Sequence, residues 1–209
     1  MATARSRWPL VLGVCVAAAM LALGAAGFAL LGPSERNAAP AASRTLSPVV
    51  RFQLTLPSGL RLVPEQPPAL TFDGSRLALV ALDQESNRRQ VYVRLLNSLS
   101  TQPLTGTLDA QYPFWSPDGR RLAFFANGSL RLLELDSGQV QDLAPAPNAA
   151  GAGLWLDDRI VFPRSTGPVV KVPLTGGIPQ LAAPFDASRE SNQSLVGALA
   201  DGRLIVSSQ

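Results

Sequence analysis

The side chains that could do chemistry in this 209-residue chain form few of the combinations that known sites require. Histidine is absent, which removes the commonest general base and metal ligand and excludes a Ser-His-Asp triad. The single cysteine, Cys15, cannot form an internal disulfide. Asp157-Asp158 and Asp83-Gln84-Glu85 offer too few oxygens for a calcium loop and indicate hairpin turns or solvated positions. We therefore assign no catalytic, cofactor-binding or metal-ligating residue.

Charge is scattered along the chain. The net charge is +3, and Lys171 is the only lysine, so arginine carries almost all of the positive charge. No run of five or more like charges occurs, which argues against a nucleic-acid partner. Arg88-Arg89 and Arg120-Arg121 are expected at exposed turn or strand positions, as solvated charges or as contacts for a partner.

Residues 9–32 are uncharged and mostly apolar. About 20 apolar residues span a bilayer as a helix, whereas the apolar core of a cleaved signal peptide has roughly 7–15. This length predicts a transmembrane signal anchor of a single-pass inner-membrane protein. A long signal peptide cut near residues 22–24 or 39–41 is the alternative.

The flanks of this stretch set the expected topology. Arg5 and Arg7 precede it and favour an N-terminus inside the cell. Residues 1–8 would then be a short cytoplasmic tail, with the C-terminal region in the periplasm. Residues 33–48 are rich in Ala, Pro and Ser, which is typical of a flexible tether.

Residues 49–209 have the pattern of short strands. Apolar and polar residues alternate from Val50 to Leu56, which predicts a strand with one buried face. The turn at residues 57–59 would let residues 60–63 pair back on it. No amphipathic helix pattern follows. Turn dipeptides recur instead, at Asp73-Gly74, Asp118-Gly119, Asn127-Gly128, Ser137-Gly138, Gly176-Gly177 and Asp201-Gly202.

The strands repeat. Four apolar residues that follow turns serve as anchors: Leu77, Leu122, Ile160 and Leu204, with spacings of 45, 38 and 44 residues. In the first three units a second strand follows (residues 90–95, 130–135 and 169–172), and a short one ends the unit (102–105, 140–143 and 179–182). Four strands in about 40–45 residues are the signature of a β-propeller blade. We expect an all-β propeller of four-stranded blades, with about three and a half blades present.

The sequence WSPDGRRLAFF, residues 115–125, shows how one such hairpin is encoded. Pro117 presets the backbone for a first turn position, Asp118 can bond the backbone ahead, and Gly119 can adopt a positive φ. Trp115 and Phe124 are expected to pack between blades.

This hairpin, followed by Leu130 to Leu135 and Leu143, resembles the WD-like repeats of TolB-type β-propellers. The wider layout of an apolar helix, a tether, residues 52–57, 112–116 and 172–177 is similar to the extracytoplasmic sensor region of bacterial membrane serine/threonine kinases. The resemblance covers roughly residues 9–209. It implies a non-catalytic, membrane-anchored module that binds or senses a protein or small ligand, without a cofactor.

The chain departs from that family pattern in two respects. It carries no kinase motifs, and it ends inside the fourth unit, so we expect residues 49–209 to be a truncated propeller region. A short protein that completes its ring with another chain remains an alternative, as does a degenerate gene product. A different functional class also remains open, because prolyl-oligopeptidase-like serine peptidases carry a propeller before their catalytic domain.

Overall fold

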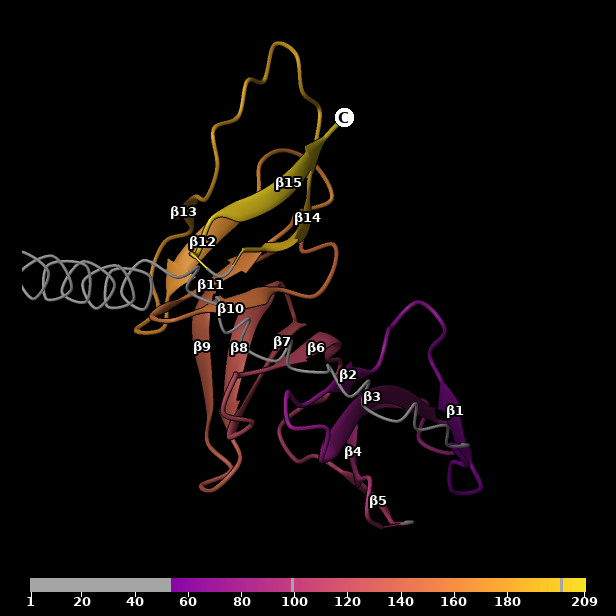
Figure 1. Ribbon diagram of the computed structural model, residues 1–209. Helices are drawn as coiled ribbons and strands as arrows, with labels where there is room; N and C mark the ends of the chain where they lie inside the picture. The colour runs from indigo at the N-terminus through magenta and orange to yellow at the C-terminus, as the bar shows by residue number, and fades with distance from the viewer. Residues whose placement is uncertain (1–53, 99, 200) are drawn as a thin grey trace, which may run out of the picture. The chain divides into compact units, whose positions relative to one another are not determined.

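The computed structural model describes residues 54–98, 100–199 and 201–209, which lie in one unit, Gln53–Gln209. Figure 1 shows these residues as strands joined by turns and loops. The strands are β1 (Leu60–Leu62), β2 (Ala69–Leu70), β3 (Arg76–Asp83), β4 (Arg88–Leu95), β5 (Thr101–Pro103), β6 (Gln111–Trp115), β7 (Arg121–Ala126), β8 (Ser129–Glu134), β9 (Val140–Pro145), β10 (Leu154–Leu156), β11 (Arg159–Phe162), β12 (Val170–Pro173), β13 (Gln180–Leu181), β14 (Gln193–Ala198) and β15 (Leu204–Ser208). The predicted tail, signal anchor and tether (1–8, 9–32 and 33–48) lie outside the described residues. Within the described ranges, no helix is long and apolar enough to cross a membrane.

The strands form successive antiparallel sheets in chain order. Sheet 1 contains β1 to β5, sheet 2 contains β6 to β9, and sheet 3 contains β10 to β13. Hairpin 4 contains β14 and β15. In sheets 2 and 3, each strand pairs with the next one along the chain. Among the described residues this confirms the all-β prediction with three units and a half, although sheet 1 has five strands where four were expected, because β1 is added at the edge of β3.

The predicted anchors occupy one position of the repeat. Each lies at the start of the strand that follows a turn, β3, β7, β11 or β15, and pairs with a residue near the end of the strand before it. The pairs are Leu70 with Leu77, Trp115 with Leu122, Trp155 with Ile160, and Ala198 with Leu204. The common register places side chains with the same offset from an anchor on corresponding faces of successive sheets.

One predicted hairpin is wrong in its described part. Residues 54–56 form no strand, and β1 pairs with β3 rather than with the segment before it. The reason is that β3 has eight residues while β2 pairs only with its first part, so its remaining edge accepts β1. The alternating side chains Leu54 and Leu56 instead pack against buried residues of sheet 1. The alternation of residues 54–56 therefore reflects a segment that covers the sheet, and residues 50–53 lie outside the described part.

Sheet 2 is buried on both faces. In β7, Leu122 and Phe124 belong to a core shared with Ala78 and Val80 of sheet 1. The next residue, Phe125, points to the other face and belongs to a second core. Its ring centroid lies 5.3 Å from that of Phe162 in sheet 3. A strand covered on both faces needs apolar residues at every position, which explains the continuous run LAFFA. Successive sheets therefore stack face to face, as propeller blades do.

Trp115 confirms the expectation that aromatic residues pack between units. Its side chain is 8% exposed and belongs to the core between sheets 1 and 2. Its Nε1–H also donates a hydrogen bond to the Ala69 carbonyl oxygen in β2, at 3.0 Å. One side chain thus joins the two sheets by both packing and a polar contact.

The β6–β7 turn forms as its sequence predicts. The Gly119 N–H donates to the Ser116 carbonyl at 2.9 Å, and Gly119 has a φ of 66°. Asp118 Oδ1 accepts hydrogen bonds from the Ser116 hydroxyl (2.5 Å) and from the Arg120 N–H (3.1 Å). These bonds satisfy the turn's backbone locally, so the hairpin has one favoured geometry.

The β2–β3 turn repeats this geometry although its sequence lacks the Ser-Pro pair. Thr71 takes the place of Ser116, and its hydroxyl donates to Asp73 Oδ1 at 2.6 Å. Asp73 also accepts from the Ser75 N–H at 3.0 Å, as Asp118 does from Arg120. A hydroxyl two residues before the aspartate is therefore the feature that the two turns share.

Replacing Trp115 by Phe should lower the free energy of unfolding by about 1 kcal/mol through the lost hydrogen bond, with a further loss of buried ring area. Trp155→Phe is the matched control. Trp155 is 9% exposed, and its Nε1–H has no hydrogen-bond partner among the described residues. Urea unfolding should show the larger loss for Trp115→Phe; equal losses would contradict a role for the bond to Ala69.

The turn aspartates should make stability depend on pH in acid. The Thr71 hydroxyl, followed by the Ser75 backbone and hydroxyl, lowers the pKa of Asp73 from 3.8 to about 2. Because the folded pKa lies below the unfolded one, the stabilisation is complete above about pH 4 and is lost as the pH falls through about 2. Asp73→Asn should therefore flatten the acid limb of an unfolding-midpoint profile between these values. Asp136→Asn, which removes a carboxylate from another turn, is the control and should leave that limb steeper.

Candidate functional site

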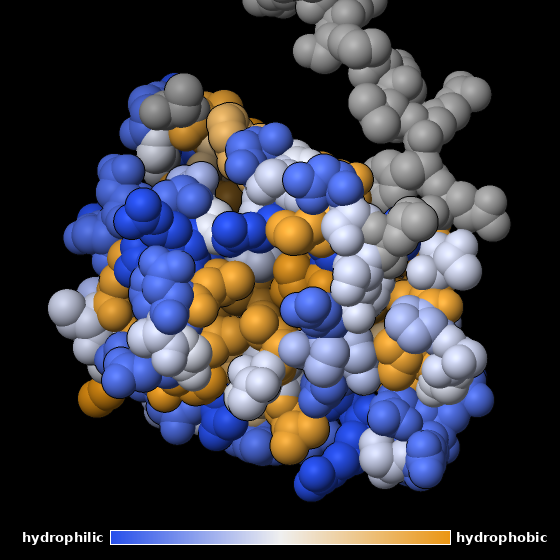
Figure 2. All heavy atoms as spheres, turned by 90° about the horizontal axis from the view of Figure 1, so that it is seen from below, coloured by the Kyte–Doolittle hydropathy of each residue, from blue (hydrophilic) through white to orange (hydrophobic). Residues whose placement is uncertain are grey.

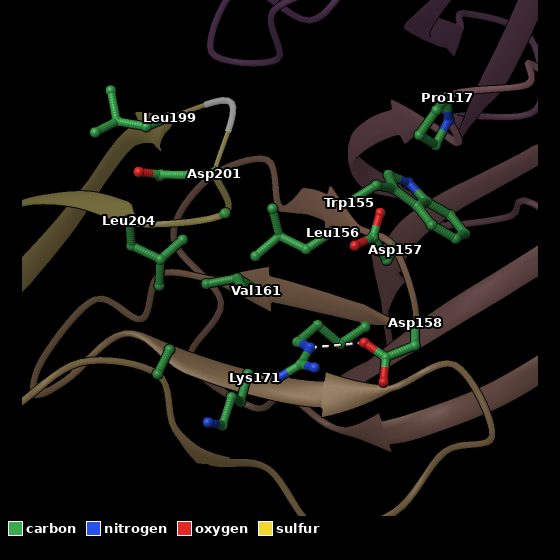
Figure 3. A pocket seen from close by; sticks show the side chains of 13 residues that line it. Pro117, Trp155, Leu156, Asp157, Asp158, Val161, Lys171, Leu199, Asp201 and Leu204 are labelled. Atoms are coloured by element: carbon green, nitrogen blue, oxygen red, sulfur yellow. Dashed lines mark hydrogen bonds and ion pairs between the residues drawn. The ribbon is translucent and has the colours of Figure 1, made fainter.

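The interface between sheet 3 and hairpin 4 contains a cavity of about 570 Å³. The interfaces between sheets 1 and 2 and between sheets 2 and 3 contain buried apolar clusters, and a smaller cavity of about 320 Å³ lies beside the first of these, lined by Val93 and Leu135. Figure 3 shows Leu156, Val161 and Leu204 near the middle of the cavity. In that view Lys171 lies on one side of these apolar side chains, and Asp201 lies on the other.

Strand alternation explains which side chains face the cavity. Ile160 and Val172 point into the core shared with sheet 2. The residues that alternate with them, Val161 and Lys171, pair across β11 and β12 and line the cavity. Arg159, two positions before Val161 on the same strand, also lines it. The face of sheet 3 toward hairpin 4 is therefore partly apolar and partly cationic.

Lys171 occupies a position that is apolar in the other units. It pairs with Val161, the residue after the anchor Ile160. The residues at this position in sheets 1 and 2 are Val93, opposite Ala78, and Leu132, opposite Ala123. Leu132 is buried in the core between sheets 2 and 3, and Val93 is half-buried against the core between sheets 1 and 2. The only lysine of the chain thus stands at an inter-sheet position, where it is half-buried.

An arginine precedes every anchor, and its contacts change along the chain. Arg76 Nη1 donates to the Gly119 carbonyl of sheet 2 at 3.0 Å. The Arg121 guanidinium carbon lies 5.1 Å from the centre of the Trp155 ring in sheet 3, a cation–π contact. The expectation of a solvated Arg121 is therefore wrong, because the face of the next sheet supplies an aromatic partner. Arg120 and Arg88 are exposed, as expected.

The arginines of the last two units pair with carboxylates of their own turns instead. Arg159 Nε lies 2.7 Å from Asp158 Oδ1, the contact drawn as a dashed line in Figure 3. Arg203 Nε lies 2.7 Å from Asp201 Oδ2. The hydrogen bond from Arg159 lowers the pKa of Asp158 below its ordinary value. Asp158 is therefore held ionised, and its charge is balanced by Arg159.

The sequence candidates for metal chemistry lie in separate turns. Asp157 and Asp158 form the two-residue turn between β10 and β11. Asp83, at the end of β3, accepts the Glu85 N–H at 2.9 Å and so shapes the next turn. Both observations confirm the predicted turn roles. In the residues that the structure describes, no three His, Cys, Asp or Glu side chains gather as metal ligands.

Sequence reasoning missed Lys171 as a site residue. The signal was present, because aligning the three units on their anchors places Lys171 with Val93 and Leu132. The alignment alone does not predict the cavity. The cavity depends on the position of hairpin 4, because Leu199, Asp201 and Leu204 form its opposite wall.

Hairpin 4 is joined to the segment before β12 by backbone hydrogen bonds of Gly167 with Ser191 and Gln193, and by the buried side chain of Gln193. Gln193, at the start of β14, is 2% exposed. Its Oε1 accepts the Val169 N–H at 3.3 Å, and its Nε2 donates to the Pro184 carbonyl at 2.7 Å and to Glu190 Oε2 at 3.0 Å. The amide fixes where β14 begins and hence where β15 stands across the cavity.

Apolar side chains also reach the surface outside the cavity. Phe72, in the β2–β3 turn, is 94% exposed, and Ile178, after β12, is 85% exposed. Figure 2 shows one face on which apolar side chains gather in a hollow between polar ones. Gathered apolar area of this kind is typical of surfaces that contact a partner.

Comparison with known proteins finds structural similarity only. No protein-family model matches the chain, and no curated protein has a significantly similar sequence. A putative TolB from Agrobacterium tumefaciens is 17% identical, with a TM-score of 0.46, over 57% of this chain and 50% of that one. The β-propeller domain of the Trilobed protease from Pyrococcus furiosus is 18% identical, with a TM-score of 0.44, over 57% and 43%. An oligogalacturonate lyase in complex with manganese is 18% identical, with a TM-score of 0.47, over 61% and 41%.

The matched part spans half or less of the length of each of these three structures. Two of them are a TolB and a protease propeller. The stacked antiparallel sheets of this chain, two of them four-stranded, have the arrangement of β-propeller blades.

Replacing Gln193 by Leu should loosen hairpin 4. Leucine has a similar size but cannot bond the Val169 N–H or the Pro184 carbonyl, at a cost of roughly 1–3 kcal/mol for each buried group left unpaired. Hydrogen exchange of the Val169 amide should accelerate, and the thermal midpoint should fall. Ser194→Ala, the adjacent change, should have little effect on either. An unchanged Val169 exchange rate in Gln193→Leu would contradict the fastening role.

Proposed function

We propose that this protein is a non-catalytic, membrane-anchored β-propeller module that binds a ligand or protein outside the cytoplasm. The observation that carries the proposal is the cavity between sheet 3 and hairpin 4. Its volume of about 570 Å³ lies within the range of roughly 300–1,000 Å³ that is typical of ligand pockets. Its apolar centre and few charged groups are also the usual composition of such pockets.

The packing around the cavity favours recognition. Val161 and Lys171 stand on paired strands whose opposite face is fixed in the core with sheet 2. Side chains held by a packed sheet lose little freedom when a ligand binds, which favours affinity. The apolar side chains gathered on the face in Figure 2 are also suited to contact with a protein partner.

The charges that line the cavity suit binding better than proton transfer. A general acid or base works best with a pKa near the operating pH. The Arg159 side chain lowers the pKa of Asp158, which moves this carboxylate away from that range. Asp158 is therefore poorly suited to act as a general acid or base, which agrees with the proposal of a binding module.

The membrane part of the proposal rests on the uncharged residues 9–32 and on the resemblance to kinase sensor regions described above. Residues 33–48 would then act as the tether that holds the propeller near the membrane surface. The ligand would be met in the periplasm, and the sensing role follows from that position.

The topology can be measured with fusions at Gln209. Alkaline phosphatase should be active and a cytoplasmic fluorescent reporter dark, and the protein should stay in the pellet after alkaline carbonate extraction. Deleting residues 9–32 should release it from the membrane or retain it in the cytoplasm. N-terminal sequencing of the membrane-held product should begin at the original N-terminus. A product that begins after residue 24 or 41 would overturn the anchor in favour of a cleaved signal peptide.

Binding is tested by a thermal-shift screen of the full chain in detergent. A ligand that binds only the folded state raises the unfolding midpoint in a concentration-dependent way. The screen should contain small acids, amines, sugars and short peptides of the cell envelope. At least one class should give a saturable rise. If none does and envelope proteins also leave the midpoint unchanged, the binding function is overturned.

A further inference from the structure

We infer that the cavity between sheet 3 and hairpin 4 takes a ligand that carries one carboxylate on an apolar body, and that Lys171 binds this carboxylate. The inference deepens the proposed binding function and rests on it. It assigns a site and a chemical class of ligand to the module.

The first argument is the place of Lys171 in the repeat. At the same register position, Val93 and Leu132 help to fill the interfaces that follow sheets 1 and 2. A lysine at this position introduces a charge where packing alone would favour an apolar side chain. Partial burial of a charge is unfavourable unless an opposite charge accompanies it. An anionic ligand supplies that opposite charge.

The second argument is the pairing of the charges around the cavity. Arg159 is bonded to Asp158, and Arg203 is bonded to Asp201, each at 2.7 Å. Among the described residues, no carboxylate lies within ion-pair distance of the Lys171 ammonium group. Lys171 is therefore the cation at this cavity whose charge remains available for a ligand.

The third argument concerns the rest of the ligand. Leu156, Val161 and Leu204 line the middle of the cavity, as Figure 3 shows. They offer contacts to a hydrocarbon or aromatic group and none to a polar one. The cavity volume of about 570 Å³ holds a body of that kind.

The same geometry disfavours a phosphate. A phosphate dianion is usually held by several donors, by a bidentate arginine or by backbone N–H groups. The nearby Arg159 already binds Asp158, and the exposed Asp157 carboxylate lies on the rim. A single ammonium group without further free donors matches one negative charge better than two.

The only lysine of the chain permits a selective probe. Reductive methylation with ¹³C-formaldehyde labels the Lys171 amine and the N-terminal amine, and both keep their positive charge. The full chain in detergent should therefore give one methyl signal from the cavity and one reference signal. The probes are 3-phenylpropionate, its neutral amide 3-phenylpropanamide, and acetate, which lacks the apolar body.

We expect 3-phenylpropionate to shift the Lys171 signal saturably and to leave the N-terminal signal in place. The neutral amide and acetate should each bind at least tenfold more weakly. Equal responses to the acid and its amide would overturn the role of the charge, and equal responses to acetate would overturn the apolar body. No shift of the Lys171 signal by any probe would overturn the inference as a whole.

Two variants complete the test. Lys171→Leu copies Leu132 and should keep or raise the thermal midpoint, while the rise caused by 3-phenylpropionate falls at least tenfold in potency. Arg88→Leu removes an exposed cation from β4 in sheet 1 and should bind as the unmodified chain does. A Lys171→Leu variant that still binds the acid would overturn the site. If that variant does not fold, the ¹³C titration of the methylated chain with its original sequence tests the site by itself.

The outcomes separate this inference from the proposed function. If other compounds raise the midpoint in the screen while the Lys171 signal stays fixed, the module binds a ligand elsewhere and only the inference fails. If no compound or protein raises the midpoint and no signal moves, both fail.

Discussion

Burial of both faces of each sheet is the constraint on which the rest of the structure depends. A four-stranded sheet of alternating side chains presents two apolar faces, and neither can stay in water without loss of stability. Phe124 and Phe125 are adjacent in β7, yet they enter different cores, one shared with sheet 1 and one with sheet 3. Each sheet therefore needs a neighbour on either side. This requirement explains why the same hairpin pattern recurs along the sequence.

The turns fix the register of the hairpins, and the arginines before the anchors make contacts between neighbouring sheets. Hydroxyl–aspartate turns at Thr71 and Ser116 close the β2–β3 and β6–β7 hairpins with local hydrogen bonds, so these two hairpins have the same register. The arginine before the anchor then reaches the next sheet, through a carbonyl for Arg76 and an aromatic ring for Arg121. At Arg159 the partner changes to the neighbouring Asp158. The contacts across the sheets thus change at the interface that contains the cavity.

That change connects the scaffold to the proposed site. Lys171 replaces the apolar residues Val93 and Leu132 at this position of the repeat, and the larger of the two cavities described above lies beside it. The cavity is formed by a break in a repeated packing rule, and rigid neighbours on the other face of sheet 3 hold its walls. The packed repeat itself holds the walls of such a binding site in place.

The sequence by itself determined the strands, their turns and their period, because alternation, Asp-Gly turns and the anchor spacing are local properties. It also indicated that Trp115 and Phe124 pack between units. It misplaced residues 54–56, since an extended segment that covers a sheet alternates as a strand does. Only the tertiary structure decided that Arg121 stacks on Trp155 and that Lys171 and Asp201 face one cavity. Those contacts join residues from different sheets, and their geometry depends on how the sheets stack, which no local pattern specifies.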